Sequence, residues 1–404
     1  MPEVGFVNLL VVSVVALLAP LALGSVPRLR VPAVVLEIVA GVVLGPSVLG
    51  WVEVDLPVSI GAVLGLAFLL FLAGLEIDIR TLRGAVLRLA LAGYAVTLVL
   101  GLGVGGALDA LGWTASPTLV AVTLSATSLG LVVPVLKDAG RLDGVLGQSV
   151  VAAASVADFA AIVLLSLFFS TSESSTGTRV ALLGVFAALV GVTGVVALAV
   201  SRSVRLSQTV VRLQDTTAEI RVRASVVLLV GFVALAAQLG LETILGAFLA
   251  GAVVGLVDRD STSHPHFRIK LEALGYGFLI PVFFVASGLR LDLDGLVDDP
   301  SALARVPVLA LGLLVVRGVP ALLLVRQHGG RSAVAAGLLQ ATSLPFLVTA
   351  GQIGVATGTL TSTTAAALVC AGLVSVVAFP AIALGLLKEG TEPARPQPSS
   401  AARS

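Results

Sequence analysis

The sequence predicts an all-α polytopic membrane protein. Of its 404 residues, 57% are hydrophobic and only 12% are charged, and the mean hydropathy is +1.11. Soluble globular domains are about half apolar and a quarter charged, which excludes that class. Two further observations specify the architecture: a series of apolar runs of membrane-spanning length, and short motifs that occur twice in the same order.

About thirteen transmembrane helices are expected, since about 20 apolar residues cross a bilayer. The chain begins Met1-Pro2-Glu3 without a positively charged segment, so the first apolar run is expected to be a retained span and not a cleaved signal peptide. The expected spans are residues 6–23, 32–49, 58–77, 87–108, 118–136, 147–169, 180–200, 224–239, 244–257, 274–289, 302–325, 333–353 and 360–387.

The distribution of basic residues predicts the orientation. If the N-terminus lies outside, all but four of the 24 Lys and Arg residues fall in inner loops or in the C-terminal tail. Cytoplasmic loops are enriched in Lys and Arg, so the expected location is the cell (inner) membrane with a cytoplasmic C-terminus.

Three short motifs recur at an offset of 210 to 215 residues. The offset moves each motif along by seven expected spans, and an odd number inverts the second copy in the membrane. Inverted-topology repeats are the architecture of secondary transporters. The pairs are Ala40–Gly45 with Ala250–Gly255, Phe71–Asp78 with Phe284–Asp292, and Ala126–Leu129 with Ala341–Leu344.

The third motif, Ala-Thr-Ser-Leu, predicts two broken helices. Each copy lies in mid-span near a proline, Pro134 or Pro345, which cannot donate a helical hydrogen bond. Hydroxyl groups and unwound carbonyls suit a desolvated small cation, whereas a plain proline kink with packed hydroxyl groups is the alternative. The candidate ligands are Thr127, Ser128, Thr342 and Ser343.

Asp158 is the principal candidate for the functional site. It lies at the midpoint of the apolar run Gly147–Phe169, where a carboxylate costs about 2.5–3.5 kcal/mol on an insertion scale. Such a residue normally faces a polar cavity or a partner, although capping of a kinked helix is the alternative. Ser155 is on the same helix face and supplies either an oxygen ligand or helix packing. In the second repeat, Ala371 is expected at the position of Asp158.

Arg317 is the second charge within a span. A guanidinium is always protonated, so it needs a carboxylate or carbonyl partner in the membrane. We expect it in the core near Asp158; an interfacial position at the inner helix end is the alternative. Glu37 and Glu76 lie near span ends and are expected at the membrane interface, although Glu37 could reach a cavity.

The glycine motifs indicate close helix packing. Gly101–Gly106 fits G-x-G-x-x-G, but it lies inside an apolar span and lacks the strand that a dinucleotide fingerprint requires. The pairs Gly41/Gly45 and Gly251/Gly255 are small-xxx-small patterns, which allow helices to approach closely.

No cofactor, resident metal or nucleic-acid partner is expected. His264 and His266 have no third ligand nearby, the net charge is only +1, and the single cysteine, Cys370, cannot form an intrachain disulfide. Residues 202–223 combine basic and periodic apolar positions, which is typical of an amphipathic segment on the inner surface.

Four stretches resemble the monovalent cation:proton antiporter superfamily, in particular its Kef-type branch with a sodium/hydrogen exchanger-like membrane domain. They are Pro32–Gly50, Leu69–Glu76, Leu245–Gly251 and Pro281–Leu289. The resemblance implies a homodimer in which a core domain moves against a dimerisation domain. It also implies an ion site where two broken helices cross beside an aspartate helix, to which Asp158 belongs.

This resemblance divides the chain into six segments. They are residues 1–83 and 224–297 with dimerisation-domain helices 1–3 and 8–10, residues 84–170 and 298–388 with core-domain helices 4–6 and 11–13, residues 171–223 with a linker helix and the inner amphipathic segment, and residues 389–404 as a disordered tail.

The resemblance also assigns the site residues and shows three departures. Asp158 matches the ion-binding aspartate, Thr127 and Ser128 match the unwound helix, and Arg317 matches the core Lys/Arg position. Ala157 stands where the family usually has Asp, Asn or Gln. Leu-Pro-Phe at residues 344–346 replaces a frequent Gly-Glu-Phe, and no nucleotide-binding domain is expected after the last span.

The leading functional hypothesis is a transporter that exchanges Na⁺ or K⁺ for protons at Asp158, without enzymatic activity. Since Ala157 leaves one titratable group at the site, exchange is expected to be electroneutral. The alternatives are a sodium-coupled organic-anion symporter on a similar inverted-repeat fold, a passive channel, and an intramembrane aspartyl protease. The protease would require two facing carboxylates.

Overall fold

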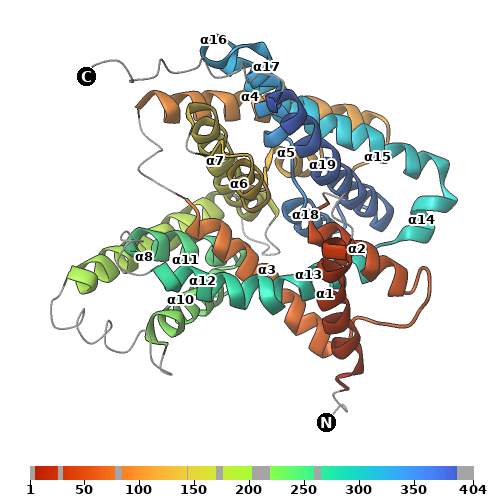
Figure 1. Ribbon diagram of the computed structural model, residues 1–404, viewed down its shortest axis with the longest axis horizontal. Coiled ribbons are helices and arrows are strands. Elements are labelled where there is room, and N and C mark those ends of the chain that lie inside the picture. Colours follow the sequence, from red (N-terminus) through yellow and green to blue (C-terminus); the bar gives the residue numbers. More distant parts are fainter. Residues whose placement is uncertain are drawn as a thin grey trace, which may run out of the picture.

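The structure is a computed structural model of the chain that describes residues 5–25, 31–77, 84–142, 144–169, 176–202, 219–258 and 265–388. Within these ranges the regular structure is entirely helical (Figure 1). Most of the amphipathic segment expected over residues 202–223, and the tail expected over residues 389–404, lie outside the described residues.

The helices follow the expected apolar runs. In chain order they are α1 (Val7–Ser25), α2 (Ala33–Leu44), α3 (Leu56–Leu75), α4 (Gly84–Ala110), α5 (Pro117–Ser125), α6 (Leu129–Asp138), α7 (Val145–Phe169), α8 (Thr176–Arg202), α10 (Ile220–Gln238), α11 (Thr243–Val257), α12 (Pro265–Leu274), the π-helical turn η1 (Gly275–Leu279), α13 (Ile280–Leu289), α14 (Leu293–Asp298), α15 (Pro300–Leu313), the π-helical turn η2 (Leu314–Gly318), the 3₁₀ helix η3 (Val319–Leu324), α16 (Val325–His328), α17 (Gly330–Gln340), α18 (Pro345–Ala356) and α19 (Ser362–Lys388).

Ten helical segments among the described residues are long and apolar enough to cross a membrane. If the pair α17 and α18, which is bent by 43°, is counted as one span, the number of candidate spans rises to eleven. Helices α2 and α11 are apolar but shorter. The chain is therefore a multi-pass membrane protein by length and composition, whereas the number of thirteen spans stays a prediction. One expected helix starts earlier than predicted, because α12 and η1 precede α13 without a break.

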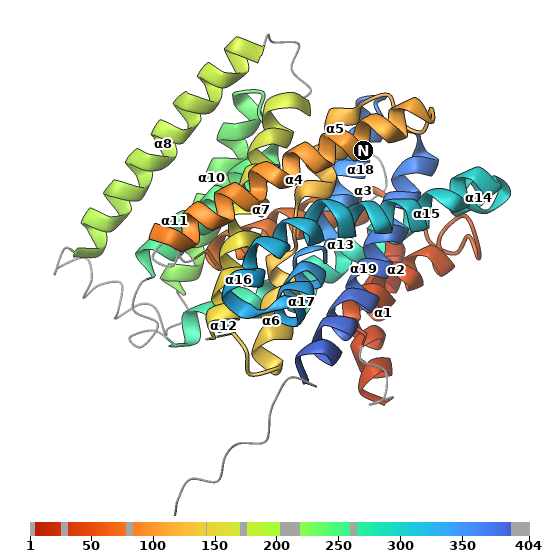
Figure 2. The same cartoon turned by 90° about the horizontal axis from the view of Figure 1, so that it is seen from above.

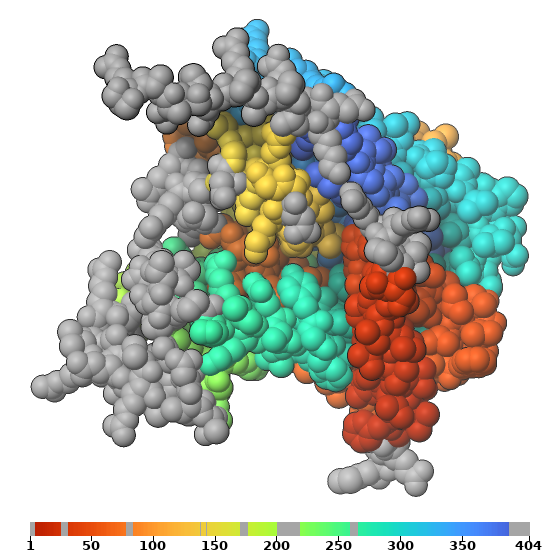
Figure 3. Space-filling view, viewed as in Figure 1, coloured from red at the N-terminus to blue at the C-terminus, as the bar shows by residue number. Residues whose placement is uncertain are grey.

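The helices pack into two bundles (Figures 1 and 2). One contains α1, α2, α3, α10, α11 and α13, and the other contains α4, α5, α7, α15, α17, α18 and α19. Helix α8 packs against α11 and α7 at the edge of the molecule. In the space-filling view, α12 and α13 (green) and α1 (red) form the lower surface, and the yellow α6 region lies above them (Figure 3).

Two pairs of glycines bring helices of the first bundle into backbone contact. A Cβ built on Gly41 of α2 would collide with the Val285 carbonyl of α13, and one on Gly288 would collide with the Ile38 carbonyl of α2. Gly74 of α3 and Gly251 of α11 face the opposing backbone in the same way.

These glycines correspond to one another in the sequence repeat. Gly41 aligns with Gly251 and Gly74 with Gly288, so the contact of α2 with α13 and the contact of α3 with α11 are two copies of one arrangement. The repeated motifs thus form equivalent interfaces. Without a hydrophobic driving force in lipid, such close van der Waals packing is a main source of helix association.

The G-x-G-x-x-G pattern is also a packing motif, as predicted. It lies entirely on α4, where Gly101 contacts Ala121 of α5 and Gly105 faces the Pro117 backbone. A Cβ on Gly103 or Gly106 would meet no atom within 4 Å. Only the glycines on one face of α4 are therefore required by packing.

Replacing Gly251 or Gly288 by alanine should lower the free energy of unfolding by about 1–3 kcal/mol, because the added methyl group forces the two backbones apart. Alanine at Gly103 or Gly106 should be neutral or slightly stabilising, since alanine favours a helix over glycine by about 1 kcal/mol. Thermal unfolding in detergent measures the difference. Equal losses at all four positions would contradict the packing argument.

Candidate ion site

The two Ala-Thr-Ser-Leu motifs form helix breaks that cross each other. Helix α5 ends at Ser125 and α6 begins at Leu129, while α17 ends at Gln340 and α18 begins at Pro345. The Ser128 amide donates to the Thr342 carbonyl at 2.9 Å, and the Thr127 hydroxyl donates to the Gln340 carbonyl at 2.6 Å. Unwound backbone from both halves of the chain therefore meets at one point inside the protein.

The two breaks have different causes. Pro345 is the first residue of α18, a position at which an amide would have no hydrogen-bond partner within the helix. A proline also disfavours the helical conformation of the residue before it. Pro134 lies inside α6, beyond the first break, so this proline does not cause the break as predicted. There, Ala126 and Ser128 adopt extended conformations with ψ of 154° and 96°. The freed amides of that break bond to a side chain from another helix.

That side chain is Asp158, at mid-length of α7. Its Oδ1 accepts from the Thr127 amide at 3.0 Å and its Oδ2 from the Leu129 amide at 3.2 Å. The residue is only 8% exposed. A hydrogen bond to a charged group contributes about 1.5–3 kcal/mol, so two of them are comparable with the cost of placing a carboxylate in the membrane.

Arg317 lies beside the same break, as expected, but it contacts Asp158 only through Thr127. Its Nε donates to the Thr127 hydroxyl at 2.8 Å and its Nη1 to the Thr97 hydroxyl at 3.3 Å, and the residue is 2% exposed. Among the described ion pairs, none joins Arg317 to Asp158. The arginine sits on the π-helical turn η2 just before Pro320, where the regular helical pattern changes.

A cavity of about 300 Å³ reaches Asp158 from one side of the molecule. Its wall includes Asp158, Ser128 and Gly130 at the first break, Pro32 and Ala33 at the start of α2, and Ala73 near the end of α3. The cavity therefore extends to the side on which α2 begins and α3 ends. It lies between the two bundles, since α2 and α3 belong to one bundle and α7, which carries Asp158, belongs to the other.

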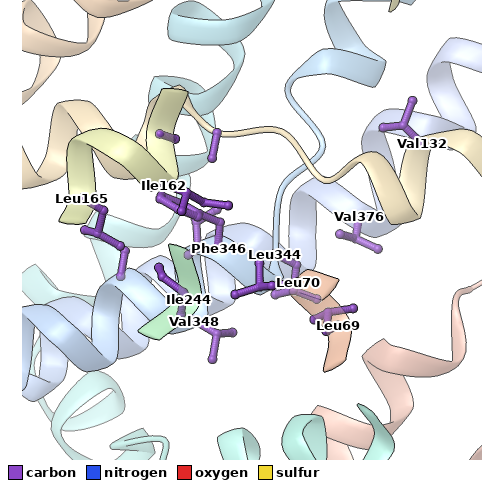
Figure 4. Close-up of a cluster of buried hydrophobic side chains, with 14 of the residues drawn as sticks. Leu69, Leu70, Val132, Ile162, Leu165, Ile244, Leu344, Phe346, Val348 and Val376 are labelled. Carbon is purple, nitrogen blue, oxygen red and sulfur yellow. The ribbon is translucent and has the colours of Figure 1, made fainter. Parts of the chain in front are cut away.

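Apolar side chains from both bundles enclose the cavity. Leu69 and Leu70 of α3, Ile162 of α7 and Phe346 of α18 line it, and they belong to one buried cluster (Figure 4). Leu344, at the second break, packs in the same cluster. Asp158 and the unwound segment of the first break therefore lie at the end of a mostly apolar passage.

Of the remaining predicted ligands, Thr342 and Ser343 lie at the second break, whereas Ser155 lies away from the crossing. Thr342 contributes its carbonyl to the crossing, while its hydroxyl donates to the Leu338 carbonyl in the last turn of α17. The Ser343 hydroxyl is buried without a hydrogen-bond partner among the described residues. Ser155 donates to the Val151 carbonyl and lines a separate apolar cavity, so the structure does not bring it to the crossing.

Our alignment of the second repeat was wrong at one position. Ser375, and not Ala371, takes the place of Asp158: its hydroxyl accepts from the Ser343 amide at 3.2 Å and lies 2.9 Å from the Ser343 carbonyl. Aligning Ala152–Ala154 with Ala365–Ala367 places the counterpart of Asp158 four residues too early in the chain. A neutral hydroxyl therefore holds the second break where a carboxylate holds the first.

Sequence reasoning missed several polar residues at the site. Thr97 and Gln340 contact Arg317 and Thr127, and both are buried. The sequence indicates these two residues only in that each is polar and lies within an apolar run. Glu37, which we assigned to the interface, is 5% exposed and lines the cavity. In the described part of the chain, no group of three His, Cys, Asp or Glu could hold a metal ion; His264 lies outside it.

The sequence is similar to one protein family and to several individual antiporters. The family described as "Sodium/hydrogen exchanger, transmembrane" matches residues 13–386. The putative Na⁺/H⁺ antiporter YjbQ of Bacillus subtilis is 33% identical over 88% of this chain. The Na⁺/H⁺-K⁺ antiporter GerN of Bacillus cereus is 29% identical over 67% of this chain and 68% of its own length. The chain spans 58% of the length of YjbQ and 34% of that of cation/H⁺ antiporter 18 of Arabidopsis thaliana.

A solved structure supports the fold. The sodium proton antiporter MjNhaP1 of Methanocaldococcus jannaschii superimposes with a TM-score of 0.66 over 95% of this chain and 98% of that one, at 17% identity. At 17% identity, this structural similarity is evidence for the fold alone and not for a function. The family match covers both helix breaks, the Asp158 helix and Arg317. The chain belongs to the sodium/hydrogen exchanger family of transmembrane proteins.

Proposed function

We propose that this chain exchanges a monovalent cation, Na⁺ or K⁺, for protons by alternating access. The observation that carries the proposal is the Asp158 carboxylate, buried at the crossing of two helix breaks and exposed to one cavity. Family membership and the antiporter relatives support the cation:proton class. Asp158 takes up either a proton or a cation, so the two compete for one site.

The neighbouring residues have distinct roles in this proposal. Ser128 lines the cavity beside Asp158 and supplies a hydroxyl ligand. The Thr127 hydroxyl both donates to Gln340 and accepts from Arg317, so it positions the crossing and is not a free ligand. Arg317 places a permanent positive charge near the carboxylate without occupying it.

The transport step follows from the cost of an uncompensated charge in a low dielectric. A protonated or cation-bound Asp158 is neutral, and the bundle that contains α4, α5 and α7 can then move against the bundle that contains α2, α3 and α13. The empty, charged carboxylate would incur the desolvation penalty during the same motion. Free movement of the empty site is thereby disfavoured, which couples the two fluxes.

The cavity disfavours the alternative of an organic-anion symporter. The described residues that line it include the carboxylates of Asp158 and Glu37 and no Lys or Arg. An anionic substrate would meet these negative charges without a basic side chain in the described cavity wall, whereas a cation is attracted. The relatives named above are antiporters by name and give the symporter no support.

The topology and assembly are part of the same proposal. We infer from the Lys/Arg distribution that the cavity mouth, at the start of α2 and the end of α3, faces the cytoplasmic side of the cell membrane, which would make this conformation inward-facing. We further propose a homodimer of the Kef-type branch. In it, residues 1–83 and 224–297 form the dimerisation domain, and residues 84–170 and 298–388 form the moving core.

Asp158→Asn should abolish exchange in proteoliposomes, because an amide can neither bind the proton nor compensate a cation. Folding should be retained, since the amide oxygen still accepts a backbone hydrogen bond. Dequenching of a pH-sensitive dye after addition of Na⁺, K⁺ or Li⁺ measures exchange. Asp109→Asn, at an exposed position of α4, is the matched control. Cation-driven proton movement by the Asp158→Asn protein would refute the mechanism.

Exchange should be electroneutral, because Asp158 is the one acidic group that the described residues place at the crossing, and each cycle replaces one proton with one cation. An imposed membrane potential should change the rate by less than about twofold. Net movement of one charge would contribute about 2.3 kcal/mol per 100 mV, which corresponds to roughly 50-fold. Initial rates at a series of ionophore-clamped potentials distinguish the two cases.

Thr127→Val should lower both stability and transport. The substitution leaves the Arg317 Nε and the Gln340 carbonyl without their buried partner, which costs about 1–3 kcal/mol for each group. Thr127→Ser keeps the hydroxyl and should behave like the wild type. Thermal unfolding in detergent and exchange rates test the pair. Similar behaviour of the valine and serine variants would show that the hydroxyl does not hold the crossing.

A further inference from the structure

Glu37 is a second buried carboxyl group that faces the Asp158 cavity. It lies on α2, near the end where that helix begins, and is 5% exposed. The cavity that contains Asp158 and Ser128 also has Glu37 in its wall. The two acidic residues approach the same space from different bundles, since Asp158 lies on α7.

The surroundings of the two carboxyl groups differ. Asp158 accepts two backbone amides, whereas no hydrogen bond or ion pair reaches the Glu37 carboxyl from the described part of the chain. A buried carboxylate without a partner is strongly unfavourable. Glu37 is therefore suited to hold a proton or a cation that enters through the cavity, because no group in the described part of the chain compensates its charge.

The other charged groups nearby do not replace such a ligand. Among the described residues that line the cavity, the ionisable ones are Glu37, Asp158 and Tyr276. Helix α13 packs along α2 and contains no charged residue. Arg290 follows α13 and is next to Leu289, which lies against Gly45 at the other end of α2. Helix α1 carries no charged side chain, and α19, which also contacts α2, has a charged residue only at its last position, Lys388.

We propose that Glu37 is a second cation- and proton-accepting site in the same cavity, fixed to the non-moving bundle, from which ions load onto Asp158. This inference rests on the proposed exchange function. Because Glu37 stays in place while Asp158 moves, it does not change the number of charges carried per cycle. Its negative charge raises the local cation concentration at the mouth of the passage.

Transport kinetics test the loading role in the full chain in proteoliposomes. Glu37→Gln should raise the half-saturating Na⁺ or K⁺ concentration about tenfold, which corresponds to about 1.4 kcal/mol of binding. The rate at saturating cation should stay within about twofold of wild type, and Glu37→Asp should restore much of the affinity. Glu53→Gln, at an exposed position, is the matched control. A half-saturating concentration equal to that of the control would overturn the proposal.

Equilibrium binding gives a test that does not need transport. With Asp158→Asn as background, purified protein should still bind ²²Na⁺ weakly, and the double variant Asp158→Asn/Glu37→Gln should lose that binding. Glu37→Asp in the same background should retain it, which also covers the case in which the glutamine variant does not fold. Equal ²²Na⁺ binding by the single and double variants would refute the site. Exchange by Asp158→Asn alone would instead refute the proposed function.

Discussion

The structure depends on the contact between the Asp158 carboxylate and the two amides of the first helix break. Each partner would be unfavourable alone. Unwound backbone in a membrane protein leaves donors without acceptors, at several kcal/mol for each group, and a carboxylate at that depth lacks solvent. Placed together at 3.0 and 3.2 Å, they satisfy each other. The positive end of α6 adds about 0.3–1 kcal/mol of favourable interaction with the anion.

The indirect position of Arg317 has a functional consequence. A direct ion pair at about 4 Å would stabilise the empty carboxylate by about 4 kcal/mol at an effective dielectric constant of 20. A cation from the cavity would then have to displace the guanidinium. In the structure, the Thr127 hydroxyl accepts the hydrogen bond of the Arg317 Nε, and among the described residues only backbone amides donate to Asp158. The carboxylate oxygens therefore still have lone pairs that can bind a ligand. The arginine fixes the second break through Thr127 and Gln340.

Much of this arrangement was predictable because it follows from strong sequence signals. A charged residue in the middle of an apolar run, as at Asp158 or Arg317, must find a partner, and two identical Ala-Thr-Ser-Leu motifs identify the breaks. The identity of the partners was not predictable. That Thr97 lies against Arg317, and that Glu37 faces a cavity and not the interface, depends on how α4 and α2 are rotated and packed. Hydropathy does not encode that rotation.

The difference between the two breaks then bears on charge movement. The repeat supplies matching interfaces and matching unwound segments, yet Ser375 holds the second break with a neutral hydroxyl where Asp158 holds the first with a carboxylate. In the proposed exchange, a second carboxylate in the bundle that contains α7 would require a second proton or cation before each crossing. With serine there, the proposed cycle needs one compensating ion. Glu37 does not alter this balance, because it lies on α2 in the opposite bundle.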